Sequence, residues 1–232
     1  MLACVGLSQL SDLQPREPVQ CYEHEAMGNL LHIDIKKLGR IERLSHRVTG
    51  HRRDSVKGIG WAFLFVAVDD PARIVFTGMH PNERQESAVQ FLHDVVAYYA
   101  SLDMRIKHVL TDNGIQFTNR RRDRYCLEHI FTRVCKEHGI EHRLTQLKHP
   151  WTNGQVERMN RTIKEATVKR FHYDDHAQLQ QHLAGFMDAY NFGRRLKTLK
   201  GLTPYEFICK QWDAQPERFR IAPSHLMMRL NT

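Results

Sequence analysis

Three carboxylates occupy positions in the sequence from which they could bind metal ions. Asp34 lies within the alternating segment LLHIDIKK, Asp112 ends the apolar segment IKHVLTD, and Glu157 lies in the amide-rich, basic segment WTNGQVERMNRTIK. Mg²⁺ prefers hard oxygen ligands and keeps coordination positions for water and phosphate. Two such ions about 3.5–4 Å apart activate an attacking oxygen and stabilise a leaving one. The three acids therefore predict a two-metal site for phosphoryl transfer, in which Asp34 bridges both ions and Asp112 and Glu157 each hold one.

Each of these acids, taken alone, also has an ordinary structural explanation. Strand alternation places Asp34 on the face opposite the apolar residues of its segment, which fits a side chain that faces solvent. Asp112 precedes an Asn-Gly pair, which is typical of turns. Glu157 and Arg161 stand at i and i+4, which is an ordinary ion pair of an exposed helix. The prediction of a metal site therefore depends on all three acids together.

The segment that contains Glu157 has the pattern of a helix with two distinct faces. Three polar residues follow Glu157 on its own face, at +3, +4 and +7, namely Asn160, Arg161 and Lys164. A separate apolar stripe lies about 120° away at about 100° per residue, and it consists of Val156, Met159, Ile163 and Ala166. One face is thus expected to pack against the protein, while the other presents an acid beside amide and basic groups.

The rest of the sequence supplies the elements that must position these acids. Alternation and short apolar runs bounded by turns predict strands at residues 30–37, 61–70, 73–80, 106–112 and 140–146. Helical spacing and caps predict helices at 85–102 and 125–139, from about 153, at 176–192, and from the capping box Thr203-Pro204-Tyr205-Glu206. This order predicts an α/β protein with a mixed five-stranded sheet flanked by helices and a C-terminal helical extension. It matches the element order of the ribonuclease H-like fold.

Composition indicates one domain with two terminal segments. We expect a linker remnant at residues 1–28, a catalytic core with C-terminal helices at 29–212, and an irregular tail at 213–232. No apolar run reaches the roughly 18 residues that a membrane span needs, so no membrane association is expected. The net charge of +8 favours a partner with a phosphate backbone, although an ordinary basic protein would fit the charge equally well.

The cysteines are scattered and odd in number. Five cysteines without a regular spacing indicate a reducing compartment, so a cytoplasmic protein is expected. A zinc site is disfavoured because the candidate side chains, on a helix at about 100° per residue, would point around most of its circumference. These candidates are Cys126, His129, Cys135 and His138.

Around the three acids the sequence resembles the DDE transposases and retroviral integrases, and within them the bacterial insertion-sequence transposases of the IS481 type. The matching stretches extend from about residue 31 to 232 and are HIDIKKLGRI, VLTDNGIQFT, HPWTNGQVERMNRTIKEA, DAYNFGRRLKTLKGLTPYEFICK and LNT. The resemblance implies that Asp34, Asp112 and Glu157 form a catalytic triad that binds Mg²⁺ or Mn²⁺, as two ions. It also implies DNA cleavage and strand transfer into target DNA by a homo-oligomer on paired element ends, at the nucleoid of a bacterial cell.

Two features depart from the pattern of that family. The family usually carries an N-terminal helix-turn-helix region that recognises the element ends, whereas here only linker-like residues precede the first strand. A basic stretch, RRRDR at 120–124, lengthens the segment between Asp112 and Glu157 beyond the retroviral spacing, which we interpret as variation within the family. Two alternatives remain open: a truncated DNA-binding inhibitor of transposition, and a ribonuclease H-like nuclease without strand transfer.

Basic and amide side chains around the acids are expected to contact DNA. Three basic patches, at residues 40–57, 120–124 and 194–200, together predict a track for phosphates, although each patch alone fits a solvated surface. The predicted contacts are Arg40, Arg52, Arg53, Lys57, Asn113, Arg120, Arg121, Arg122, Asn153, Gln155, Asn160, Arg161, Lys164, Arg194 and Arg195.

Overall fold

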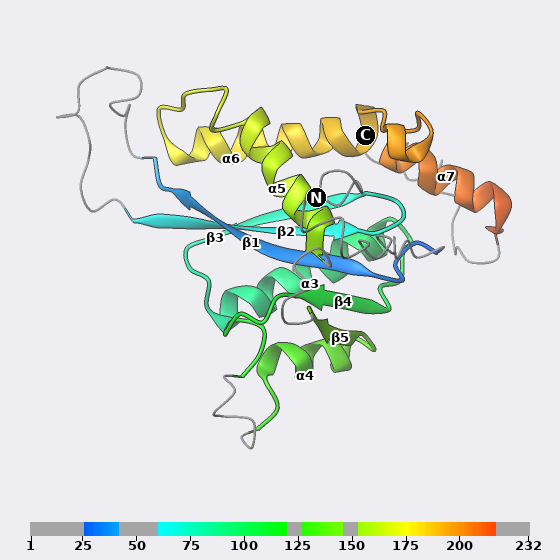
Figure 1. The fold of residues 1–232 in the computed structure, drawn as a ribbon, viewed down its shortest axis with the longest axis horizontal. Helices are drawn as coiled ribbons and strands as arrows, with labels where there is room; N and C mark the ends of the chain where they lie inside the picture. Colours follow the sequence, from blue (N-terminus) through cyan, green and yellow to red (C-terminus); the bar gives the residue numbers. More distant parts are fainter. Residues whose placement is uncertain (1–25, 42–59, 120–126, 146–152, 217–232) are drawn as a thin grey trace, which may run out of the picture.

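A computed structural model describes residues 26–41, 60–119, 127–145 and 153–216 (Figure 1). The strands of this part of the chain are β1 (Leu31–Gly39), β2 (Trp61–Asp69), β3 (Val75–His80), β4 (His108–Thr111) and β5 (Glu141–Leu144). The helices are α3 (Gln85–Ser101), α4 (Ile130–Glu137), α5 (Gly154–Ala166), α6 (His176–Asp188) and α7 (Pro204–Ala214), with a π-helical turn η5 (Ala189–Gly193) and a 3₁₀ turn η6 (Lys197–Leu199).

The five strands form one mixed sheet in the order β3-β2-β1-β4-β5. β1, β2 and β3 pair antiparallel, and β4 and β5 continue the sheet in parallel from β1. Successive antiparallel strands can be joined by a short turn, while the parallel additions need crossovers, which α3 and α4 provide. The fold class predicted from the sequence is therefore confirmed, including the hairpin formed by β2 and β3.

The sheet is covered on both faces (Figure 1). In β2, alternate residues 63, 65 and 67 join a core cluster with α3, α4 and α7, whereas residues 64, 66 and 68 join a second cluster with α5 and α6. This double covering explains why β2 is apolar along nearly its whole length. Val156, Met159 and Ile163 pack into the second cluster, as the predicted apolar stripe of α5 requires.

Most predicted boundaries differ from the structure by one or two residues, and three differences are of note. The helix predicted from residue 125 begins at Ile130, because residues 127–129 are not helical and the His129 Nδ1 accepts a hydrogen bond from the Phe131 N–H at 3.2 Å. The first strand continues to Gly39, beyond the predicted residue 37. The helix predicted at 176–192 is α-helical only to Asp188 and then widens into η5.

The C-terminal helix begins as predicted. The Thr203 hydroxyl accepts from the Glu206 N–H, and the Glu206 carboxylate accepts from the Thr203 N–H, with Pro204 at the first helical position. The helix runs to Ala214, and most of the predicted terminal segments lie outside the described residues. Within the described part of the chain, no helix is long and apolar enough to cross a membrane.

Candidate active site

Asp34 lies in the middle of β1, on the sheet face that α5 covers. Its partner across the antiparallel ladder is Val66, a member of the cluster beneath α5. The Asn160 side chain, from α5, donates a hydrogen bond through Nδ2 to Asp34 Oδ2 at 2.6 Å. Asp34 is therefore half-buried under a helix, and it does not simply face solvent as strand alternation alone would allow.

Asp112 follows the last residue of β4, next to the strand that carries Asp34. The parallel register pairs Leu31 with Val109 and His32 with Leu110, so continuing it by two residues brings Asp112 beside Asp34. The Asp112 Oδ1 accepts the Gly114 N–H at 2.9 Å, which is the turn geometry that the Asn-Gly pair predicts. Asp112 thus forms a turn and also lies at the carboxyl end of a strand, where sites gather in α/β sheets.

Glu157 lies in the first turn of α5 with an exposed side chain. A helix N-terminus carries partial positive charge, which favours an ionised carboxylate there. Asn160, which holds Asp34, comes one turn later on the same face of the helix. The hydrogen bond from Asn160 therefore brings the face that carries Glu157 over the middle of β1.

The charges of the other two acids affect the pKa of Asp34. Burial raises the pKa of Asp34 above its usual value, while the Ile35 backbone N–H lowers it. The negative charges of Asp112 and Glu157 then raise the pKa further. The structure thus brings together three carboxylates that are far apart in sequence, from two adjacent strands and one helix.

The donor chemistry fits a hard divalent cation, although the side chains are not drawn into a closed ligand set. Among the described residues, no three or more His, Cys, Asp or Glu side chains lie close enough together to hold one metal ion. A cation would offset the mutual repulsion of the acids, and carboxylate oxygens are the ligands that Mg²⁺ and Mn²⁺ prefer. Among the described residues, the buried Oδ1 of Asn160 has no hydrogen-bond partner, which adds another oxygen beside Asp34.

Four amide side chains that the sequence predicts to contact DNA form hydrogen bonds within the protein. Asn113 donates to the Thr145 carbonyl, Asn160 donates to Asp34, Gln155 donates to Asp70, and Asn153 contacts His32. Asn153 and Asn160 are also buried. Their contact with DNA stays a prediction, and the structure gives these amides a role in holding α5 and the loop after Asp112 in place.

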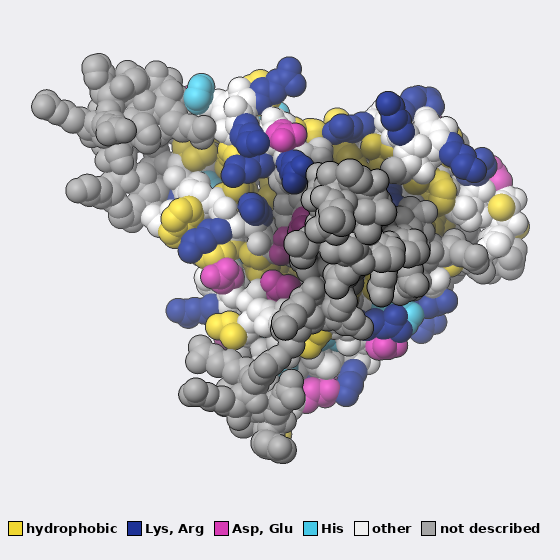
Figure 2. Space-filling model, viewed as in Figure 1, with side chains coloured by type: hydrophobic (Ala, Val, Ile, Leu, Met, Phe, Trp, Pro, Cys, Tyr) yellow, Lys and Arg dark blue, Asp and Glu magenta, His cyan; other side chains and the backbone are white. Residues whose placement is uncertain are grey.

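The predicted basic contacts fall into two groups. The first group lies within the described residues. Arg161 and Lys164 are exposed on α5, and Arg40 is exposed just after β1. The guanidinium of Arg194 lies 5.8 Å from the ring centre of Tyr190, and Arg195 pairs with Glu206 at 3.3 Å. The other predicted contacts lie outside the described residues and are Arg52, Arg53, Lys57, Arg120, Arg121 and Arg122. Figure 2 shows acidic side chains near the middle of one face, with many Lys and Arg side chains above them, toward α5, α6 and α7.

The zinc candidates within the described residues serve different parts of the fold. His129 contacts the start of α4, and Cys135 is buried in the core. His138 Nε2 lies 3.0 Å from Nδ1 of His93, at the side of α3. Cys126 lies outside the described residues.

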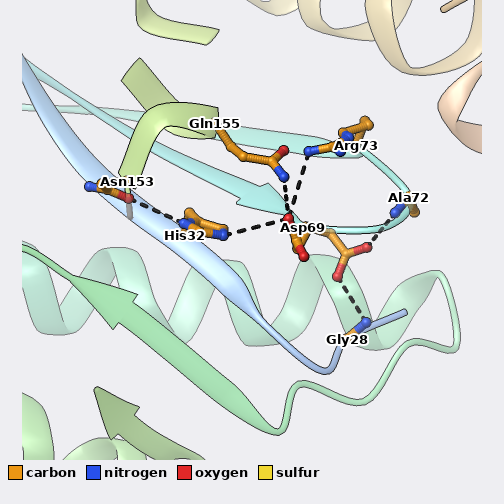
Figure 3. A network of polar contacts seen from close by, with 8 residues as sticks. Gly28, His32, Asp69, Ala72, Arg73, Asn153 and Gln155 are labelled. Atoms are coloured by element: carbon orange, nitrogen blue, oxygen red, sulfur yellow. Dashed lines mark hydrogen bonds and ion pairs between the residues drawn. The ribbon is translucent and has the colours of Figure 1, made fainter. Parts of the chain in front are cut away.

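A polar network near the start of α5 was not recognised from the sequence (Figure 3). It joins His32 of β1, Asp70 and Arg73 of the β2–β3 turn, and Asn153 and Gln155 at the beginning of α5. The only signal for it was the Asp69-Asp70 pair after an apolar strand, which predicts a turn and no more.

A mixed five-stranded sheet with helices on both faces is the fold of integrase catalytic cores. Residues 24–150 match the family described as the integrase core domain, and residues 138–204 match a second model of the same description. The chain belongs to the integrase core domain family.

Curated relatives match only parts of the chain. A putative integrase, ORF3 of Spiroplasma virus SpV1-C74, is 23% identical over 150 residues, which is 63% of this chain and 41% of that protein. A retrovirus-related Pol polyprotein from transposon TNT 1-94 of Nicotiana tabacum is 39% identical over 112 residues, or 47% of this chain and 8% of the polyprotein. The chain thus spans less than half the length of either relative.

Solved structures share the fold. The catalytic core of BIV integrase gives a TM-score of 0.53 at 18% identity and covers 81% of this chain and 98% of its own. The HTLV-2 integrase catalytic core in complex with magnesium gives 0.53 at 16% identity, covering 78% of this chain and 95% of its own. A simian T-cell lymphotropic virus intasome, in complex with a PP2A regulatory subunit, contains a chain with a TM-score of 0.57 at 18% identity, over 78% of this chain and 54% of that chain.

Proposed function

We propose that this protein is a DDE transposase of the IS481 type, which cleaves DNA strands at the ends of an element and joins them to target DNA. The observation that carries the proposal is the grouping of Asp34, Asp112 and Glu157 at one site of an integrase core fold, where the charges of two acids raise the pKa of the third. A hard divalent cation would offset the repulsion between acids so placed.

Asp34, Asp112 and Glu157 would hold Mg²⁺ or Mn²⁺, as two ions. When bound, such ions lower the pKa of an attacking water or hydroxyl and stabilise the leaving oxygen. The chain's own polar groups orient the acids: the Asn160 Nδ2 fixes one oxygen of Asp34, and the Gly114 N–H fixes one oxygen of Asp112. In strand transfer, the 3′ hydroxyl of the freed end attacks a target phosphodiester, forms a new phosphorus–oxygen bond and displaces the 3′ oxygen of the target strand.

The wider biology of the protein follows from the same proposal. The partners are the element ends and target DNA, and the chain acts as a homo-oligomer on DNA, in the cytoplasm and at the nucleoid of a bacterial cell. Among solved structures of the same fold, one is an intasome and one is a complex with magnesium, which supports DNA and a divalent cation as partners. Residues 29–212 are proposed as the catalytic core, although α7 continues two residues beyond the predicted boundary, to Ala214.

The first experiment is an assay on a branched DNA that mimics the joined product, with Mg²⁺ or Mn²⁺. The reaction of this substrate reports the chemical step of strand transfer and depends little on recognition of element ends. We expect the purified chain to resolve the branch by strand transfer, and Asp112→Asn and Glu157→Gln to lose this activity while still binding DNA. Hydrolysis without joining would indicate a nuclease, and DNA binding without any reaction would indicate an inhibitor of transposition.

A further inference from the structure

The first turn of α5 lacks the usual local means of fixing a helix start. Asn153 occupies the N-cap position, but its side chain accepts no hydrogen bond from the helix backbone. An N-cap hydrogen bond typically contributes about 0.5–2 kcal/mol to a helix. Instead, Asn153 Oδ1 lies 3.3 Å from Nδ1 of His32, a buried residue of β1. The helix start is therefore held by contacts with the sheet.

Asp70 forms a second contact between the start of α5 and the rest of the protein, besides the contact of Asn153 with His32. Its carboxylate is 1% exposed and accepts a hydrogen bond from Nε2 of Gln155, in the first turn of α5. The same Oδ1 lies 3.7 Å from the Arg73 guanidinium and 3.8 Å from His32 Nε2. A buried carboxylate is costly unless such groups compensate it, so its partners are held in defined positions. Figure 3 shows these contacts as dashed lines between the strand, the turn and the helix.

The network stands in a fixed relation to two of the proposed catalytic acids. His32 and Asp34 are two residues apart on β1, so both point to the face that α5 covers. Gln155 precedes Glu157 by two residues in the same helical turn. The apolar stripe of α5, including Val156 in the first turn, packs the helix on the sheet. The contacts to Asp70 and His32 add directional polar attachments to the same turn.

We propose that Asp70, through Gln155 and together with His32, is a positioning centre that sets Glu157 relative to Asp34 for metal binding. The inference rests on the proposed function, because it assigns Glu157 to the metal site. The Gln155 amide donates to Asp70, and in this account that contact replaces the DNA contact predicted for Gln155, so Gln155 and Asp70 act only through the helix start. Partners that orient metal ligands from behind typically contribute about 10–100-fold to metal affinity or activity.

Gln155→Leu tests this, because it removes the amide and leaves Asp70 beside Arg73. The matched control is Gln90→Leu, since Gln90 makes an exposed hydrogen bond to Asp94 on α3. Gln155→Lys serves as the rescue variant, because its ammonium can donate to Asp70 in place of the amide. The measurements, on the full chain, are Mn²⁺ affinity by electron paramagnetic resonance, and kcat and KM on branched DNA with each metal.

For Gln155→Leu we expect Mn²⁺ affinity to fall about 10-fold and kcat with Mg²⁺ to fall more than kcat with Mn²⁺, because Mg²⁺ demands stricter ligand geometry. We expect KM for DNA to stay within about twofold, and Gln155→Lys to restore metal affinity and kcat. A change in overall stability alone would alter neither the Mn²⁺ affinity of the folded protein nor the ratio of kcat with Mg²⁺ to kcat with Mn²⁺. Unchanged Mn²⁺ affinity and kcat in Gln155→Leu, or equal loss in Gln155→Lys, would overturn the inference.

The proposed function can fail separately. A parent chain that binds Mn²⁺ but does not act on branched DNA would count against the transposase activity, and weaker Mn²⁺ binding by Gln155→Leu would still support the positioning centre. Two results would overturn both the proposed function and the positioning centre. One is a parent chain that binds no Mn²⁺, and the other is equal Mn²⁺ affinity of the parent and the Glu157→Gln variant.

Discussion

Asn160 links the helix and the strand that carry two of the proposed catalytic acids. Its Nδ2 donates to Asp34 at 2.6 Å, and the side chain is buried. A donor to one oxygen of a carboxylate fixes which lone pairs remain for a cation, and it also favours the ionised form. Burial and the neighbouring acids raise the pKa of Asp34. The hydrogen bond from Asn160 fixes the orientation of this carboxylate.

We expect Asn160→Ala to reduce the rate on branched DNA about 10–100-fold, because Asp34 loses the group that orients it. The control is Thr162→Ala on the same helix, where only a hydroxyl bond to the Arg158 carbonyl is lost. Rates measured at saturating DNA, with circular dichroism to verify folding, give the comparison. Equal rates for Asn160→Ala and Thr162→Ala would contradict a role of Asn160 in orienting Asp34.

At this scale the sequence predicted the acids and missed their supports. Asp34 and Asp112 stand out because each is an acid in or at the end of an apolar strand, which is a local pattern. The partners of Asp70 and His32 are 85 and 121 residues away in sequence, at Gln155 and Asn153. No local pattern encodes such contacts, because they exist only once α5 packs on the sheet.

Among the elements, β5 and α4 are joined to the end of β4 through one imidazole. His142 contacts the Thr111 hydroxyl through Nε2 at 2.8 Å and the Thr132 hydroxyl through Nδ1 at 2.9 Å. Burial is the larger cause and the charge of His129 the smaller one, and together they lower the pKa of His142 from 6.5 to about 4. Thr111 precedes Asp112, so this contact supports the strand end that carries a proposed catalytic acid.

The lowered pKa of His142 predicts a loss of stability in acid. The folded protein binds a proton at His142 less readily than the unfolded chain does. The contribution of neutral His142 to the free energy of unfolding is therefore fully present above pH 6.5 and is lost as the pH falls toward 4. The loss is roughly 2–3 kcal/mol. Urea denaturation between pH 7 and pH 4 measures the free energy of unfolding. We expect it to decline less in His142→Gln than in the parent, and the glutamine amide can still contact both hydroxyls.

Other groups titrate in the same range but cancel in that comparison. Burial raises the pKa of Asp69 to about 7, so Asp69 contributes with the opposite sign, stability that is present at low pH and lost as the pH rises toward 7. Asp69 is unchanged in His142→Gln, so the difference between the two proteins reports His142 together with its interaction with His129. Exposed His172→Gln serves as the control substitution. A parallel decline in the parent and His142→Gln would contradict the assignment.

The turn η5 explains why the predicted helix at 176–192 changes its character near its end. Asn191 accepts from the Val75 N–H at 2.9 Å and donates to the Val75 carbonyl at 2.8 Å, and it also donates to the Tyr98 hydroxyl at 3.1 Å. β3 is an edge strand, and this side chain satisfies backbone groups that a further strand would otherwise satisfy. The π-helical turn brings Asn191 to the strand, which helical periodicity alone does not predict.

We therefore expect Asn191→Leu to destabilise the protein by about 2–4 kcal/mol, because both backbone groups of Val75 and the Tyr98 hydroxyl lose a buried partner. Asn119→Leu is the control, since Asn119 makes one exposed hydrogen bond to the Leu127 carbonyl. Thermal or urea denaturation measures the difference. A change of less than about 1 kcal/mol in Asn191→Leu would show that β3 does not depend on this side chain.

Across the whole molecule, the fold places acids at the centre of a basic protein. The net charge is +8, yet Asp112 and Glu157 lie near enough to Asp34 for their charges to raise its pKa. Figure 2 shows acidic side chains near the middle of one face, with many Lys and Arg side chains above them. Charge composition could predict the affinity for a polyanion, and the family resemblance could predict the acidic site. The arrangement of the basic groups follows from packing, because the apolar stripe of α5 decides which of its side chains remain exposed.

Arg161 and Lys164 give the sharpest test of that arrangement. Both are exposed on the face of α5 that carries Glu157, and neither forms an ion pair with another described residue. Arg133 on α4 lies on the opposite side of the sheet and pairs with Glu137 at 3.9 Å, so Arg133→Gln is the control. DNA affinity falls linearly with salt on logarithmic axes, with a slope of about 0.9 for each phosphate contact.

We expect the combined variant Arg161→Gln and Lys164→Gln to bind duplex DNA more weakly and to reduce the magnitude of the salt slope by about 2, because two phosphate contacts are lost. Arg133→Gln should leave affinity and slope unchanged, since that side of the sheet faces away from the proposed site. Fluorescence anisotropy with labelled duplex, from low to physiological salt, measures both quantities for all three proteins. If the combined variant has the same salt slope as the parent, α5 does not contact DNA phosphates, and the contacts are made by basic residues outside this helix.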